Sequence, residues 1–92
     1  MGDEYELRIR SRAAKELEKD GADQDRERVA QAIDTLAEDP RPHRCVKVRG
    51  APEGTFRIRV GDYRVIYVVS HSERIVLVVR IARRSEDTYK NL

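Results

Sequence analysis

The stretch that most constrains the fold is residues 55–69, TFRIRVGDYRVIYVV, where apolar and polar side chains alternate on both sides of Gly61-Asp62. A period of two is typical of half-buried strands. A two-residue Gly-Asp loop indicates a tight hairpin turn, in which glycine supplies the positive φ. We therefore expect a β-hairpin with one apolar face toward a core and one face that carries Arg57, Arg59 and Arg64.

This arginine face is unusual because the hairpin register sets Arg59 directly opposite Arg64. Like charges in that position destabilise a sheet, so selection for stability alone would favour a different residue at one of them. Arginine forks match phosphate oxygens in geometry as well as charge, which makes the face a candidate anion site. The alternative is that these arginines extend into water or pair with acids near the C-terminus, such as Glu86 or Asp87.

The remaining periodic segments predict helices and further strands. We expect a strand at 4–10 with Tyr5, Leu7 and Ile9 toward the core, helices at 12–20 (with Ser11 as N-cap) and 23–39, and strands at 46–48 and 75–82. The last strand is nearly all apolar, so we place it inside the sheet. The order predicts one α+β domain over residues 1–92, with the helices on one face of a largely antiparallel sheet.

Charge is unevenly distributed along the chain. Residues 1–40 hold 7 Lys and Arg against 12 Asp and Glu, whereas residues 41–92 hold 12 against 5, so a net charge of +2 combines −5 and +7. A basic second half indicates a polyanion or an acidic protein as partner, although charged surfaces are common. The single cysteine excludes a disulfide framework and a cysteine metal site. We expect a cytoplasmic protein without a membrane span, metal or cofactor.

The C-terminal segment contributes further candidates. By parity, Arg80 and Arg84 share one face of the last strand and Arg83 lies on the other. Tyr89 is a packing residue or, beside several arginines, a group that can take a proton. Weaker candidates lie in loops or on core faces: His43 and His71 as bases, and Cys45, Tyr5, Tyr63 and Tyr67 as packing residues.

Four segments carry a resemblance to a known family: AEDPRP, KVRG, FRIRVGDYRVIYVV and VVRIARRSEDTY. Over nearly the whole chain the sequence resembles the RelE/ParE superfamily of type II toxin–antitoxin toxins. The resemblance implies the family's compact fold. It also implies a cognate antitoxin, with the toxin a monomer when free and a hetero-oligomer when neutralised.

For RelE-like members the resemblance implies a ribosome-dependent endoribonuclease that cleaves mRNA in the A site without a metal. A ribose 2′-hydroxyl attacks the adjacent phosphate, and cationic side chains stabilise the charged intermediate. By match to the family's motifs, the catalytic candidates are Arg57, Arg59, Arg64, Arg84 and Tyr89, and the RNA-binding candidates are Arg80, Arg83, Lys47 and Arg49. The tighter hairpin loop, and arginine in place of lysine on the strand, depart from the best-known nuclease member.

Two other functions remain open. A ParE-like toxin would bind and poison DNA gyrase without cutting RNA, and a relic would bind only its antitoxin and repress an operon. The basic face together with Tyr89 favours the nuclease, because gyrase-directed members generally lack that set.

Overall fold

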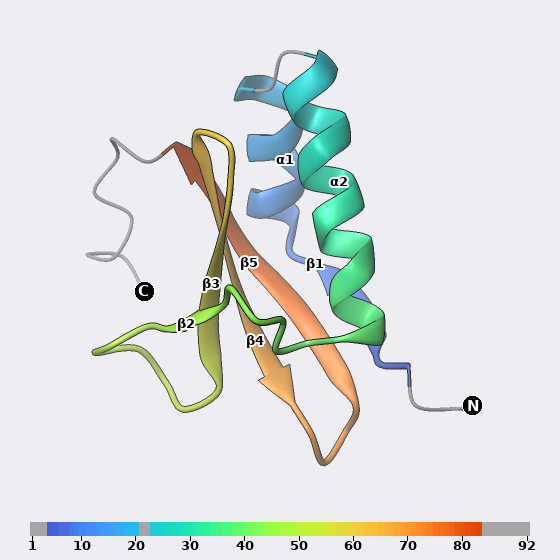
Figure 1. Ribbon diagram of the computed structural model, residues 1–92, viewed down its shortest axis with the longest axis vertical. Coiled ribbons are helices and arrows are strands. Elements are labelled where there is room, and N and C mark those ends of the chain that lie inside the picture. The colour runs from blue at the N-terminus through green and yellow to red at the C-terminus, as the bar shows by residue number, and fades with distance from the viewer. Residues whose placement is uncertain (1–3, 21–22, 84–92) are drawn as a thin grey trace.

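The computed structural model describes residues 4–20 and 23–83, which form an α+β domain as predicted (Figure 1). Its elements in chain order are β1 (Glu6–Ile9), α1 (Ser11–Asp20), α2 (Asp23–Glu38), β2 (Val46–Lys47), β3 (Thr55–Val60), β4 (Tyr63–Ser70) and β5 (Ile75–Arg83). Neither described helix is long and apolar enough to cross a membrane. The predicted boundaries hold within about two residues, the usual uncertainty of element ends.

The five strands form one sheet in the order β1-β5-β4-β3-β2. The pairings within the β2 to β5 part are antiparallel, whereas β1 runs parallel to β5, with Glu6 beside Ile75 and Ile9 beside Val78. The interior position predicted for the last strand is confirmed, because β5 lies between β1 and β4. Burial on both faces explains why its sequence is almost continuously apolar.

The hairpin of β3 and β4 has the register expected from its alternation and loop. Val60 pairs with Tyr63, and Arg59 pairs with Arg64. Gly61 has a φ of +59°, while Asp62 keeps a negative φ, the pattern of a tight type II′ turn. The apolar face of this hairpin is therefore fixed toward the core.

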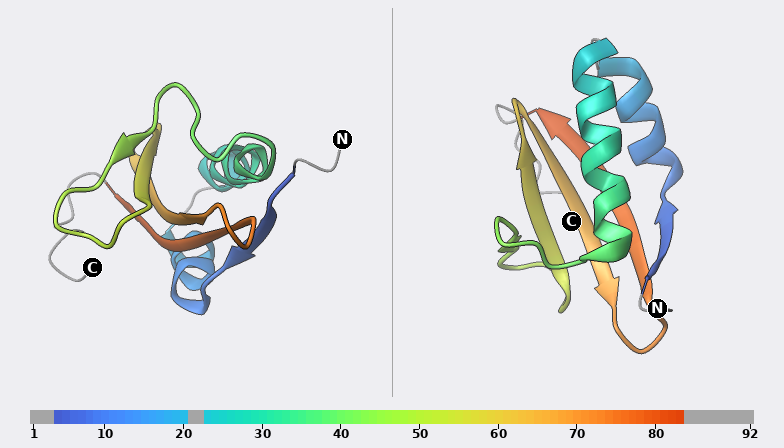
Figure 2. Two further views of the ribbon diagram at one scale, coloured as in Figure 1. Left: turned by 90° about the horizontal axis from the view of Figure 1, so that it is seen from below. Right: turned by 45° about the vertical axis from the view of Figure 1, so that its right-hand side comes forward.

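Helix α2 covers that apolar face (Figure 2). Its Val29, Ile33 and Leu36 are almost fully buried in one cluster with Ile58, Val65, Tyr67 and other strand residues. Burying each such aliphatic side chain stabilises the fold by roughly 1.5–3 kcal/mol. The Tyr67 hydroxyl donates to the Pro40 carbonyl at 2.8 Å, and burial raises the pKa of this phenol, so Tyr67 is a structural residue as expected.

Helix α1 packs against β5 and adds Ala13 and Leu17 to the core. It begins where β1 ends, so it continues along the β5 edge that β1 leaves unpaired. Its Glu16 accepts a hydrogen bond from the Ile81 backbone N–H at 2.9 Å. A strand edge is thereby closed by a side chain instead of another strand.

Two local predictions are wrong. Ile9 does not face the core: its side chain is 42% exposed, because β1 is an edge strand. Ser11 is the first residue of α1 and not its cap, since the Ala14 N–H already bonds to the Arg10 carbonyl.

Candidate functional site

The sheet face that points away from α2 carries four of the predicted arginines. Arg59, Arg64 and Ala82 are aligned across β3, β4 and β5, and the neighbouring row aligns Arg57, Ile66 and Arg80. A register shift between Ile66 and Tyr67 adds Val79 to β5 at this point, without moving Arg80 from the face. The strand pairing therefore brings Arg57, Arg59, Arg64 and Arg80 onto two adjacent rows, as their parity predicts.

Three of these arginines border a hollow of about 290 Å³, which we call the arginine hollow. Its lining residues are Arg44, Val46, Arg57, Ile58, Arg59 and Arg64. Arg59 is exposed, and Arg57 and Arg64 are half-buried. No acidic side chain is among these lining residues, so four guanidinium groups give the hollow a strongly positive potential.

Arg44 is a member that sequence reasoning did not single out. It lies in the loop before β2, and loop residues have no periodicity from which a face can be read. Only the pairing of β2 with β3, which sets Val46 beside Arg57, brings this loop to the hollow.

Lys47 and Arg49 lie next to the arginine hollow. With Val46, Val48 and Arg57 they line a second hollow of about 320 Å³, so the two hollows share Val46 and Arg57. Lys47 is 3.3 Å from a Glu53 carboxylate oxygen, but both side chains are exposed, and such a pair contributes little. Both residues are thus placed to extend the basic surface beyond β3.

Arg80 shares the face of the other arginines but not their exposure. Only 7% of the residue is exposed, and its Nε donates to Glu16 Oε2 at 2.9 Å. Its charge is therefore balanced in part by a carboxylate from α1. Arg80 is held within the fold, unlike a side chain that extends freely toward RNA.

The other candidates are distributed as follows. The side chain of Arg83, and the whole of Arg84 and Tyr89, lie outside the described residues. His43 is in an exposed loop. His71 follows β4, at the end away from Arg64, where its Nδ1 is 2.6 Å from the Tyr5 hydroxyl. Tyr63 is 4% exposed and belongs to the core, as predicted.

The arginine hollow can bind an anion with several guanidinium forks at once. Arginine stays protonated at all physiological pH values, and its planar fork contacts two oxygens of a phosphate simultaneously. Such an arrangement also stabilises extra negative charge that develops during a reaction at phosphorus.

Comparison with known proteins agrees with this geometry. The family model described as ParE toxin of type II toxin–antitoxin system, parDE, matches residues 7–88. A relative in Methanocaldococcus jannaschii that carries the name RelE1 is 33% identical over 90 residues, which covers 95% of this chain and 97% of the relative.

Solved structures show the same fold. The RelE–RelB complex from the archaeon Pyrococcus horikoshii OT3 matches with a TM-score of 0.77 and 26% identity, covering 89% of this chain and 97% of that chain. The intact RelBE toxin–antitoxin complex of E. coli matches with a TM-score of 0.75 and 27% identity, covering 89% and 99%. The chain therefore belongs to the RelE/ParE superfamily, and it is a toxin of a type II toxin–antitoxin system.

Proposed function

We propose that this toxin is a ribosome-dependent endoribonuclease that cleaves mRNA in the A site without a metal ion. The observation that carries the proposal is the arginine hollow, where Arg57, Arg59 and Arg64 meet Arg44 with no acid in the lining. A phosphodiester is the anion that this shape and charge fit best.

In the proposed reaction the ribose 2′-oxygen attacks the adjacent phosphorus, and the bond from phosphorus to the 5′-oxygen breaks. Tyr89 takes the proton from the 2′-hydroxyl, and Arg84 gives a proton to the leaving 5′-oxygen. Arg57, Arg59 and Arg64 stabilise the negative charge on the five-coordinate phosphorus between these steps. The products are a 2′,3′-cyclic phosphate and a 5′-hydroxyl.

The basic residues around the hollow are assigned to RNA binding. Lys47 and Arg49 extend the positive surface along the strand of RNA, and Arg83 lies at the end of β5. Contacts of this kind release counterions, so RNA binding should weaken steeply with salt.

A cognate antitoxin is the proposed regulator, and two solved relatives are themselves complexes with their antitoxins. Such a partner would lay a helix or extended segment on the toxin, with hydrophobic anchors and with acidic residues against the basic face. The free toxin is proposed to be a monomer.

The alternative function is poisoning of DNA gyrase, which the ParE description of the matching family model favours. The named RelE relatives and the arginine hollow support RNA cleavage instead. The two functions predict opposite results, so they can be separated directly.

The test adds purified toxin to translating ribosomes and, separately, to a gyrase supercoiling assay. We expect cuts at codon positions in the mRNA and unchanged supercoiling. Inhibited gyrase with intact mRNA would establish the alternative. Tyr89→Phe combined with Arg84→Ala should abolish cleavage and growth arrest while the circular dichroism spectrum stays unchanged; a fully toxic double variant would refute the assigned base and acid.

A further inference from the structure

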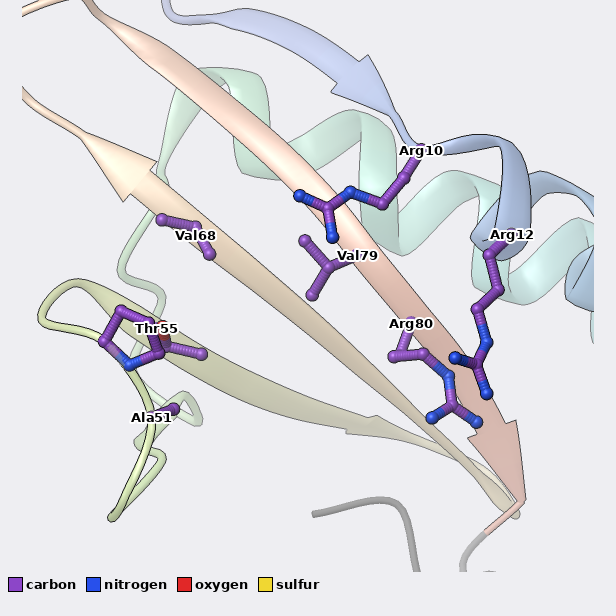
Figure 3. A pocket seen from close by; sticks show the side chains of 8 residues that line it. Arg10, Arg12, Ala51, Thr55, Val68, Val79 and Arg80 are labelled. Carbon is purple, nitrogen blue, oxygen red and sulfur yellow. The ribbon is translucent and has the colours of Figure 1, made fainter. Parts of the chain in front are cut away.

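A third hollow lies on the same sheet face, beside the start of α1 (Figure 3). It has a volume of about 260 Å³, and its lining residues are Arg10, Arg12, Ala51, Pro52, Thr55, Val68, Val79 and Arg80. Apolar side chains from β4, β5 and the β2–β3 loop form its wall, and three arginines border it. No role has been assigned to this site above.

The charges at the start of α1 are opposite to those that stabilise a helix. The N-terminus of a helix carries a partial positive charge and favours acidic residues nearby. Here the first turn holds no acidic residue, and Arg10 and Arg12 flank Ser11. An external anion would relieve this repulsion, because both the helix terminus and the arginines attract it.

Arg80 provides a second and independent indication of an anion. Its Nε is engaged by Glu16, but its Nη1 is buried and has no hydrogen-bond partner in the part of the chain that the structure describes. The Arg12 Nε also approaches the same Glu16 oxygen, at 3.9 Å. Three guanidinium groups thus face one carboxylate, which leaves an excess of positive charge at the hollow.

Thr55 adds a polar group to the opposite wall. This residue is only 2% exposed, and its hydroxyl is buried without a hydrogen-bond partner among the described residues. Leaving such a group unpaired costs about 1–3 kcal/mol. Arg80 and Thr55 both donate hydrogen bonds, so a fitting ligand must supply acceptor oxygens and negative charge.

We propose that this hollow is a second phosphate subsite, which holds a neighbouring phosphodiester of the RNA strand bound in the arginine hollow. The inference rests on the proposed function and extends it. Arg80 is separated from Arg57 by one strand, with Ile66 of β4 between them in register. Two strand spacings are about 10 Å, a distance that a single RNA strand can bridge along the face.

Access to Arg80 runs past Arg12, whose side chain is 56% exposed and leaves the start of α1 on the side of β5 (Figure 3). Rotation of Arg12 away from Glu16 lets a phosphate oxygen reach the Arg80 guanidinium. Val68, Val79 and Pro52 then border the sugar or base attached to that phosphate.

The test measures binding of single-stranded oligonucleotides whose 2′-hydroxyls are methylated, so that no cleavage occurs. An octanucleotide spans both subsites, whereas a dinucleotide fills only the arginine hollow. Arg10→Gln combined with Arg12→Gln should weaken octanucleotide binding about tenfold and lower the salt slope by about 1.4, roughly 0.7 per phosphate contact on a single strand. Dinucleotide binding should not change.

Two further variants separate a ligand site from a structural one. Arg26→Gln removes the same charge from the exposed side of α2 and should leave octanucleotide binding within about twofold. Thr55→Val removes the unpaired hydroxyl, so it should raise the melting temperature while it weakens octanucleotide binding.

The subsite is refuted if octanucleotide binding in the Arg10 and Arg12 double variant equals that of the Arg26 variant. It is also refuted if only binding of a glutamate-rich peptide is lost, which would assign the hollow to an acidic protein. Because these measurements involve no cleavage, failure of the proposed nuclease reaction on ribosomes would leave their outcome intact.

Discussion

Two arginine clusters on one sheet face handle their charge in different ways. Arg59 and Arg64 border a hollow whose lining contains no carboxylate, whereas Arg12 and Arg80 share the carboxylate of Glu16. Residue type and strand parity are the same, and only the packing of α1 differs. The first cluster keeps its charge available for a ligand, and the second uses most of it to hold α1 against β5.

The largest expected effect concerns the arginine hollow. Arg59→Ala combined with Arg64→Ala should lower mRNA cleavage on ribosomes by about 10³-fold or more, because one lost donor to a developing charge typically costs about 10²–10³. Cleavage is measured by primer extension, with Arg26→Ala as the matched control on α2. Near-normal cleavage by the double variant would mean that the reaction takes place elsewhere.

The second prediction concerns the paired cluster. Glu16→Ala leaves Arg80 as a buried cation without its carboxylate, which should lower the free energy of unfolding by about 3 kcal/mol. Urea denaturation measures the change. Glu18→Ala, at an exposed position of the same helix, should change stability by less than about 0.5 kcal/mol. Equal effects of the two variants would show that the pair in α1 and β5 contributes nothing beyond helix propensity.

The smallest effect tests the repulsion between Arg59 and Arg64. Arg59→Thr should raise the free energy of unfolding by about 0.5 kcal/mol, because it removes a like-charge pair directly across the strands. The gain should shrink as salt is added. Arg57→Thr is the comparison, since Arg57 pairs with Ile66 and its removal relieves no such repulsion. A stability gain for Arg57→Thr as large as that for Arg59→Thr would contradict this explanation.

The hairpin could be predicted from the sequence almost completely. Its alternation allows one side to be buried, and a two-residue loop fixes the register, so every pair from Val60 and Tyr63 outward follows. The shared face of Arg57, Arg59 and Arg64 depends only on these local rules. The position of Arg80 on that face follows from the same parity.

The surroundings of the arginines could not be predicted in this way. Glu16 meets Arg80 across 64 intervening positions, through a helix placement that no local pattern encodes. Arg44 reaches the arginine hollow through the pairing of a two-residue strand. Ile9 was assigned to the core because its strand alternates, but alternation cannot distinguish an edge strand that extends past its cover from a covered one.

The parallel pairing of β1 with β5 has a consequence for synthesis of the toxin. Residues near the N-terminus wait for partners that lie close to the C-terminus, since Glu6 pairs with Ile75 and Ile9 with Val78. A nascent chain cannot complete its sheet until most of its length has left the ribosome, and contacts so distant in sequence also form slowly. Translation of the toxin can thus finish before the folded molecule exists to act on the ribosome that made it.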